Sequence, residues 1–320
     1  MGHTISVRNG PAVQAAQEIA QRHGIAAQQA RVLHDANNVV VHLAPSPVVA
    51  KICRASVGDH GWRKLATELE IARHLIRAGA PVVGPSQELP PGPHVHGDFA
   101  MTFWRHQDHD PDALATGRSA GYALAQVHEA LDSYAETLPS FLDRQVRRTA
   151  KILFSESAPF PLPTSDRDFL CSQYMSITSA LRDRTLKWRT LHGDPHRGNV
   201  LVCSAGYLFI DFESVCAGPL EWDLSALPGH GAGAFDVDED LLSLLRRLRS
   251  LCVAVWCWTR ARSSTALDRA ARNHMGLLRL AANGTAAAGQ RSIAERGWPE
   301  NLDAPVPGRR GAHTVEVDGS

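Results

Sequence analysis

The sequence has no excess charge of either sign, no long apolar run and no paired-cysteine motif. Lys plus Arg and Asp plus Glu both total 33, so no net charge draws the chain toward nucleic acid or an anionic membrane. The longest apolar run, residues 251–258 (LCVAVWCW), is far shorter than the roughly 20 residues of a transmembrane helix. We therefore expect a protein that binds neither nucleic acid nor membrane.

The six cysteines are scattered along the chain without a C-x-x-C pair. This spacing excludes the common zinc sites and disulfide scaffolds, and indicates reduced thiols used as small core residues. Residues 1–10 (MGHTISVRNG) lack the basic-then-apolar order of a secretion signal. These observations predict a cytoplasmic protein, and its length of 320 residues with 44% hydrophobic content favours about two folded domains.

The first hundred residues combine β-branched runs with amphipathic helical patterns, punctuated by Gly and Pro. Gly24 and Gly79 each follow a helical pattern, as glycine does at helix C-termini. The order of elements is a helix, a β-hairpin, a second helix and a second β-hairpin. The expected ranges are a helix over 11–23, strands over 39–43 and 48–52, a helix over 62–77, and strands over 86–89 and 99–104.

From residue 112 onward the pattern becomes mainly helical, with one short β segment at 199–211. After about residue 284 the periodicity fades into Gly, Pro and Arg, which predicts a poorly ordered tail. The chain is therefore expected to have an α+β fold. The expected helices of this part are 113–130, 166–185, 239–262 and 265–283.

A polar loop followed by a tight hairpin carries the chemistry. The loop is residues 191–199 (LHGDPHRGN), and a three-residue turn over 204–206 would place Cys203 opposite Tyr207 and Asn199 beside Asp211. An amide oxygen next to a carboxylate suits Mg²⁺, which takes few protein ligands together with phosphate. Asp194, five residues before Asn199, could accept the proton of a hydroxyl that attacks a γ-phosphate.

The D-x-x-x-x-N spacing and the following IDFE segment at 210–213 resemble the aminoglycoside phosphotransferase family, the small-molecule branch of the protein-kinase-like fold. The likeness spans roughly residues 30 to 260 and includes VAK at 49–51, MTFW at 101–104, LAQVH at 124–128 and GPLEWDL at 218–224. It implies a two-lobed fold with an antiparallel sheet in the small lobe and helices in the large one. The implied boundaries are 1–104 for the N-lobe, 105–283 for the C-lobe and 284–320 for the tail.

The resemblance implies that Lys51 holds the α and β phosphates of ATP or GTP and is itself held by a glutamate on the following helix. On a helical wheel centred on Leu65, Glu68 lies about 60° away and flanks the apolar stripe, whereas Glu70 lies about 140° away. We therefore expect Glu68 to be the partner of Lys51.

The phosphate-covering turn departs from the protein-kinase pattern, because residues 34–38 (HDANN) contain no glycine. Asn38 belongs to this turn and is expected near the nucleotide, whose affinity the missing glycines could weaken. The base is expected against Thr102, Phe103 and Trp104, although a tryptophan at a lobe junction more often belongs to the core.

Three further residues are expected to support the site. In the resemblance, His192 braces the catalytic loop, and Asp223 corresponds to the structural aspartate of an Asp-Leu pair. Glu213 follows the metal aspartate closely in sequence and is included as a supporting residue.

The sequence thus favours a Mg²⁺-dependent kinase that uses ATP or GTP to phosphorylate a hydroxyl of a small polar metabolite or antibiotic. Two alternatives stay open. One is a catalytically degenerate kinase that binds a nucleotide or a partner; the other is a metallohydrolase that uses His192, Asp194 and His196 as metal ligands. The identity of the acceptor and the oligomeric state are not indicated by the sequence.

Overall fold

The computed structural model describes residues 10–35, 38–53, 59–113, 117–155, 162–227, 231–260 and 265–285. The chain forms two compact units, each assembled from separate segments of sequence. The first contains Met1–Leu138, Thr190–Cys216 and Glu221–Asp238, and the second contains Pro139–Arg189, Ala217–Leu220 and Glu239–Ser320.

This grouping places residues 191–199, the predicted catalytic loop, in the same unit as the sheet, unlike the lobes expected from the sequence. The lobe boundaries at 104 and 283 stay a prediction. The expected tail falls almost entirely outside the described residues.

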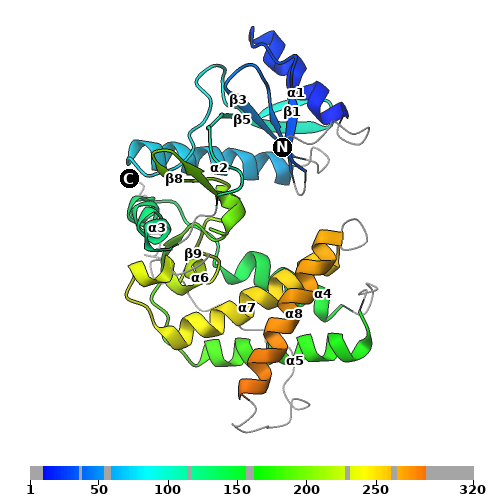
Figure 1. Ribbon diagram of the computed structural model, residues 1–320, viewed down its shortest axis with the longest axis vertical. Coiled ribbons are helices and arrows are strands. Elements are labelled where there is room, and N and C mark those ends of the chain that lie inside the picture. Colours follow the sequence, from blue (N-terminus) through cyan, green and yellow to red (C-terminus); the bar gives the residue numbers. More distant parts are fainter. Residues whose placement is uncertain are drawn as a thin grey trace, which may run out of the picture. The chain divides into compact units, whose positions relative to one another are not determined.

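The first unit is built on a five-stranded antiparallel sheet in the order β1-β2-β3-β5-β4 (Figure 1). The predicted hairpin of β2 and β3 is present, and β3 also pairs with β5, so that Lys51 lies opposite Thr102. The strands are β1 (Arg31–Asp35), β2 (Asn38–His42), β3 (Val48–Cys53), β4 (His94–His96) and β5 (Phe99–Arg105).

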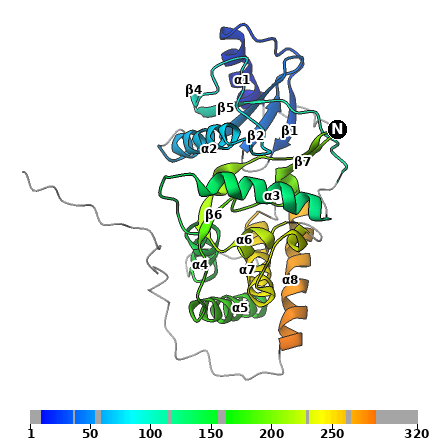
Figure 2. The ribbon, with the colours of Figure 1, turned by 90° about the vertical axis from the view of Figure 1, so that its left-hand side faces the viewer.

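Two helices cover opposite faces of the sheet (Figure 2). Helix α1 (Gly10–Arg22) packs on Val48, Ala50 and Ile52, whereas α2 (Asp59–Arg77) packs on Val49 and Trp104. Because successive side chains of a strand point to opposite faces, Lys51 shares its face with Val49 and is directed toward α2. Strand alternation alone thus aims the lysine at the helix that carries Glu68.

The hairpin of β7 (Val200–Cys203) and β8 (Gly206–Phe209) has a different register from the one predicted. Cys203 pairs with Gly206, not with Tyr207, because Gly206 has φ of 127°, a conformation open mainly to glycine, and already belongs to the second strand. Asn199 is consequently aligned with Ile210, whose N–H donates to the Asn199 carbonyl at 3.0 Å. The predicted pairing of Asn199 with Asp211 is therefore wrong by one residue.

The remaining elements of this part of the chain are short except for α3. The strand predicted over 86–89 is wrong: the structure has an isolated bridge at Pro85 and begins β4 at His94. The other elements are α3 (Gly117–Asp132), β6 (Arg189–Leu191), η2 (Arg197–Asn199), η3 (Phe212–Ser214), β9 (Cys216–Gly218), α6 (Leu220–Leu224) and η4 (Gly231–Ala234).

The second unit consists of helices, as the sequence predicts for this part of the chain. Helices α7 and α8 pack along each other (Figure 1). A short π-helical turn, η1, precedes α4, and the sequence predicts neither of these two elements. The elements are η1 (Leu142–Val146), α4 (Arg147–Leu153), α5 (Thr164–Arg182), α7 (Glu239–Trp258) and α8 (Thr265–Thr285). Across the described residues, every helix is too short or too polar to cross a membrane.

Two histidine rings are stacked where β2 ends and the chain leaves β5. The centroids of His42 and His106 are 3.8 Å apart and their planes differ by 11°; His42 Nε2 donates to the Ser46 carbonyl at 2.9 Å. Burial lowers the pKa of both imidazoles, and each pKa is also pulled down by Arg31 and up by Asp108. The pair is therefore held in the neutral form.

Acidification is expected to destabilise the first unit through this pair. Because the folded-state pKa values are depressed, the stabilisation is present above the unfolded pKa of about 6.5 and is lost as pH falls through the folded values. Between about pH 7 and about pH 5, the free energy of unfolding should fall less in His42→Gln than in the wild type. Urea unfolding at each pH measures this fall. His23→Gln, at an exposed position, should show the same fall as the wild type. Identical pH dependence in both variants would contradict the assignment.

Candidate active site

Lys51 lies at the centre of the site and is almost completely buried, with 8% of its surface exposed. Its ammonium donates to both carboxylate oxygens of Glu68, at 2.9 and 2.8 Å, and to Asp211 Oδ1 at 2.8 Å. Glu213 Oε1 is 2.7 Å from the same nitrogen. Residues from three separate segments of the sequence thus meet around one ammonium.

The choice of Glu68 over Glu70 from the helical wheel agrees with the structure. Glu68 is 2% exposed and faces Lys51, whereas Glu70 is exposed on the outer side of α2. Glu68 Oε1 also accepts a hydrogen bond from the Phe212 N–H at 3.2 Å. The helix therefore positions the lysine and the start of η3 with one carboxylate.

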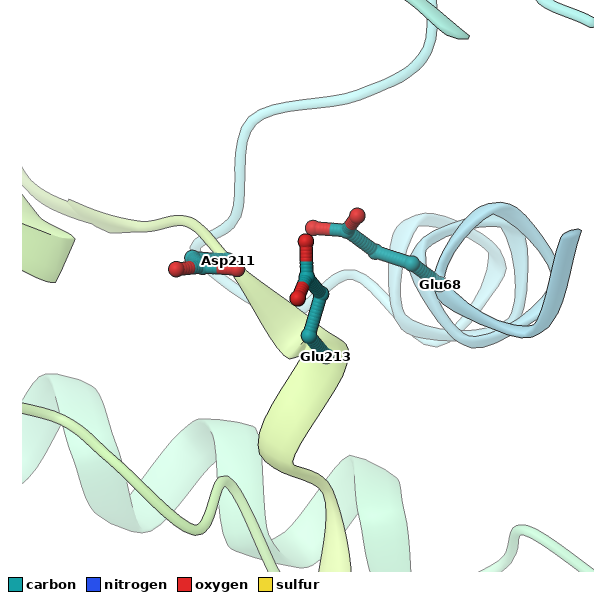
Figure 3. Close-up of side chains that lie close together, drawn as sticks. All are labelled: Glu68, Asp211 and Glu213. Atoms are coloured by element: carbon teal, nitrogen blue, oxygen red, sulfur yellow. The ribbon is translucent and has the colours of Figure 1, made fainter. Parts of the chain in front are cut away.

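Three carboxylates share one ammonium, which leaves the cluster with excess negative charge. Burial pulls the pKa of Lys51 down, but Glu68, Asp211 and Glu213 outweigh it and hold that pKa well above the usual value. Burial, together with the charges of Asp211 and Glu213, raises the pKa of Glu68 to about 7, against the opposing effect of Lys51. Figure 3 shows the three carboxylates converging from α2 and from the segment after β8.

Asp211 is held ionised and in an unusual backbone conformation. Burial alone would raise its pKa, but the charge and the hydrogen bond of Lys51 outweigh that effect and lower it. Its φ of 66° and ψ of 66° are left-handed, and no other non-glycine residue in the described ranges has a positive φ. Aspartate tolerates this region better than most residues, and the left-handed turn lies where β8 gives way to η3.

The oxygen atoms of Asp211 and Asn199 fit a hard divalent cation. Asp211 uses Oδ1 for Lys51, and its side chain is 42% exposed. Asn199 donates from Nδ2 to the Asp194 carbonyl at 3.0 Å, which fixes the orientation of the amide and of its oxygen. Carboxylate and amide oxygens are the donors that Mg²⁺ takes. Both residues predicted as metal ligands thus carry oxygen atoms of the kind that Mg²⁺ binds, and their joint role stays a prediction.

Asp194 and Asn199 lie in a loop that is closed by local hydrogen bonds. The His196 N–H donates to the Asp194 carbonyl at 2.9 Å, and the Asn199 N–H donates to the His196 carbonyl at 2.8 Å. The Asp194 side chain is 27% exposed, whereas Asn199 is 7% exposed. The loop thus keeps a partly open carboxylate next to a buried amide.

A buried carboxylate anchors the start of this loop. Asp223 is fully buried; its Oδ2 accepts from the His192 N–H and from His128 Nε2, each at 2.8 Å, and its Oδ1 accepts from the Gly193 N–H at 2.8 Å. His192 Nε2 in turn donates to the Ile210 carbonyl at 3.1 Å. This network ties α3 and α6 to the residues before Asp194.

Gly193 and His192 are fitted to this network in different ways. Gly193 has φ of 88°, and a Cβ there would lie 1.8 Å from the Ser214 carbonyl oxygen, so a side chain cannot be accommodated. Burial lowers the pKa of His192 against the charges of Asp223 and Asp194. A neutral, enclosed imidazole is therefore part of the loop's support.

Asn38 contacts the lysine cluster, whereas the side chains of the residues predicted to bind the base are buried in the core. Asn38 Nδ2 donates to Glu213 Oε1 at 2.6 Å, which joins the start of β2 to the lysine cluster. Thr102 and Phe103 are fully buried and Trp104 is 9% exposed; Trp104 Nε1 donates to Thr102 Oγ1 at 2.9 Å. These three side chains belong to the core, so their predicted role in nucleotide binding would have to come from the backbone.

Two residues of the network were not singled out from the sequence as parts of the site. His128 is a polar residue on a helix face whose neighbours Leu124, Val127 and Leu131 are all buried, and that contrast is a usable signal. The need for glycine at position 193 depends on Ser214, which lies beyond the hairpin in sequence, and has no comparable local signal.

Residues 27–263 match the APH family, described as the phosphotransferase enzyme family. The chain belongs to this family. The match confirms the predicted resemblance and the predicted enzyme class. The matched range includes all the residues named above as parts of the site of this phosphotransferase.

Solved structures with low sequence identity share the fold. The amicoumacin kinase hAmiN, solved with AMP-PNP, Ca²⁺ and Ami, is 13% identical with a TM-score of 0.60, over 85% of this chain and 96% of that one. A choline/ethanolamine kinase family protein from Mesorhizobium loti is 17% identical, TM-score 0.61, over 86% and 94%. APH(2")-IIia with GDP and kanamycin is 15% identical, TM-score 0.63, over 85% and 99%.

These likenesses confirm the predicted kinase-like α+β fold of the phosphotransferase. A comparison with curated protein sequences found no match.

Proposed function

We propose that this phosphotransferase transfers the γ-phosphoryl group of ATP or GTP to a hydroxyl of a small polar molecule. The observation that carries the proposal is the convergence of Lys51, Glu68 and Asp211 within hydrogen-bond distance, in the same compact unit as the loop that joins Asp194 to Asn199. A buried ammonium whose pKa is held high, beside the ionised carboxylate of Asp211, suits a triphosphate and its metal ion.

Lys51 and Asn38 are proposed to bind the phosphates, with Glu68 holding the lysine in place. In the structure Lys51 and Asn38 donate to the same oxygen, Glu213 Oε1, so that carboxylate lies where two donors suited to phosphate meet. Asn199 and Asp211 would hold Mg²⁺, which when bound neutralises the charge that develops on the phosphate oxygens.

Asp194 is proposed as the general base. Its carboxylate accepts the proton of the acceptor hydroxyl while the hydroxyl oxygen bonds to the γ-phosphorus. The bond between that phosphorus and the β–γ bridging oxygen breaks, and its electron pair leaves with the nucleoside diphosphate. Asp223 and His192 support this step indirectly, because they hold the backbone that precedes Asp194.

The ligands of the similar structures support the same class of reaction. The amicoumacin kinase was solved with AMP-PNP and Ami, and APH(2")-IIia with GDP and kanamycin, in each case a nucleotide together with a small molecule. Among acceptors for this chain we propose amino sugars, aminoglycoside-like antibiotics and other small polar metabolites.

The metallohydrolase alternative is not supported by the structure. His192 is fully buried, and its Nε2 donates to the Ile210 carbonyl. Among the described residues, the only group of three acidic, histidine or cysteine side chains close enough to hold a metal ion together is Glu68, Asp211 and Glu213. His192 and His196 therefore do not form a zinc site with Asp194.

The proposal is tested by an acceptor screen that measures nucleotide consumption. The purified protein is incubated with MgATP or MgGTP and aminoglycosides, amino sugars, amino alcohols or plain sugars, and nucleoside diphosphate release is followed by a coupled assay. We expect at least one class to raise release about tenfold or more above the rate without acceptor. A flat response across all classes with both nucleotides would favour the catalytically degenerate kinase.

A further inference from the structure

The His196 ring lies beside the proposed base on the open side of the loop. Its Nε2 is 3.8 Å from Asp194 Oδ2, and the imidazole is 50% exposed. His196 is also the residue that precedes η2, and its Nδ1 accepts a hydrogen bond from the Gly198 N–H at 2.9 Å. Both ring nitrogens therefore face groups of the catalytic loop.

The hydrogen bond from Gly198 fixes the tautomer of the neutral ring. A nitrogen that accepts a backbone N–H cannot carry a proton, so the proton of neutral His196 is on Nε2. Nε2–H is the atom that faces the Asp194 carboxylate. The ring is thus arranged as a donor toward the base and not as an acceptor from it.

The position of the His196 ring requires a residue without a side chain at position 198. A Cβ at Gly198 would lie 2.8 Å from His196 Cε1, closer than real Cβ contacts, and 3.1 Å from Nδ1, an unusually tight distance. Gly198 therefore leaves room for the imidazole in this position, where Nδ1 accepts the Gly198 N–H and Nε2 faces Asp194.

We propose that His196 is a positioning residue for Asp194. Its Nε2–H restrains the rotation of the Asp194 carboxylate at Oδ2, which keeps the base oriented for the acceptor hydroxyl. The separation of 3.8 Å is longer than a hydrogen bond. Catalytic contacts are often long without substrate, and we expect this one to shorten when the acceptor binds. This inference rests on the proposed function, because it assigns His196 a task only if Asp194 is the base.

Two substitutions separate this task from a purely structural one. Asparagine places its carbonyl oxygen near the position of Nδ1, so His196→Asn keeps the bond from the Gly198 N–H and loses the donor to Asp194. Glutamine places its amide nitrogen near the position of Nε2, so His196→Gln keeps the donor. We expect kcat to fall about tenfold in His196→Asn and less than threefold in His196→Gln, with the KM for nucleotide within twofold in both.

The reverse order of activities, with His196→Asn near wild type and His196→Gln impaired, would show that the ring only caps the turn and would overturn the proposal. Combining His196→Asn with Asp194→Asn is expected to add no further loss, because the donor then has no base to position. A full additional tenfold loss in the double variant would also contradict it.

The failure of the proposed function has a different signature. If Asp194→Asn retains wild-type activity, Asp194 is not the base. If no acceptor is phosphorylated, crystal structures of the two His196 variants still decide the inference: the Asp194 rotamer should be kept in His196→Gln and changed in His196→Asn. An unchanged rotamer in both would overturn it.

Discussion

Asp194→Asn is expected to lower kcat for phosphoryl transfer by about 1,000-fold, within the range of 10²–10⁴ that a positioned general base contributes. The amide has nearly the shape of the carboxylate but cannot take the hydroxyl proton at neutral pH. Asp194 makes no contact with Lys51 among the hydrogen bonds and ion pairs that the structure describes for that ammonium. Nucleotide affinity, measured by calorimetry with a non-hydrolysable analogue, should therefore change less than threefold.

Asp98→Asn is the matched control, because it makes the same chemical change at an exposed turn between β4 and β5. Its kcat and unfolding midpoint should equal those of the wild type. Equal kcat in Asp194→Asn and Asp98→Asn would remove Asp194 from the reaction. A loss of nucleotide affinity in parallel with kcat would instead indicate that the loop had lost its structure.

Where local periodicity decides the geometry, the sequence was sufficient. The alternation of Val49 and Lys51 with buried neighbours in β3 directs the lysine toward α2, and the wheel of α2 places Glu68 on the side that meets it. The resemblance supplied the expectation that a glutamate of the following helix holds Lys51, and the helical wheel chose Glu68 over Glu70. The ion pair between Lys51 and Glu68 could therefore be predicted once the two elements were recognised.

Where a single backbone conformation decides the geometry, the sequence was not sufficient. The hairpin between β7 and β8 could turn over two or three residues, and the positive φ of Gly206 selects the shorter turn. A slip of one residue exchanges the faces of a strand, which is why the predicted partner of Asn199 was wrong. Local composition does not distinguish these turns.

Contacts between distant segments were the least accessible part of the site. Glu213 reaches both Lys51 and Asn38, which is 175 residues away in sequence, and Asp223 joins His128, 95 residues away. The types of these residues can be read from the sequence, but their pairing depends on how the elements pack. The sequence indicated Glu213 and Asp223 as supporting residues but did not predict which residues they contact.

Asp223→Ala is expected to lower the free energy of unfolding of the first unit by about 3–5 kcal/mol, the usual cost of removing one partner from a buried charged network. The substitution leaves the N–H groups of His192 and Gly193 and the His128 ring without their acceptor. Each is enclosed, so water cannot fully replace the lost bonds. Urea unfolding followed by tryptophan fluorescence and by circular dichroism measures the change.

Asp223→Asn should cost less than Asp223→Ala, because the amide oxygen still accepts one or two of the three hydrogen bonds while the charge is lost. His128→Phe removes one donor and leaves the carboxylate with both loop N–H groups, so its effect should be the smallest of the three. Because Asp223 and His128 are in contact, the double variant should lose less than the sum of the single losses. Two results would contradict this assignment: full additivity of the single losses, or a cost below about 1 kcal/mol for Asp223→Ala. Either result would mean that other contacts hold the residues before Asp194. The close approach of the Gly193 backbone to Ser214 would then be the next candidate.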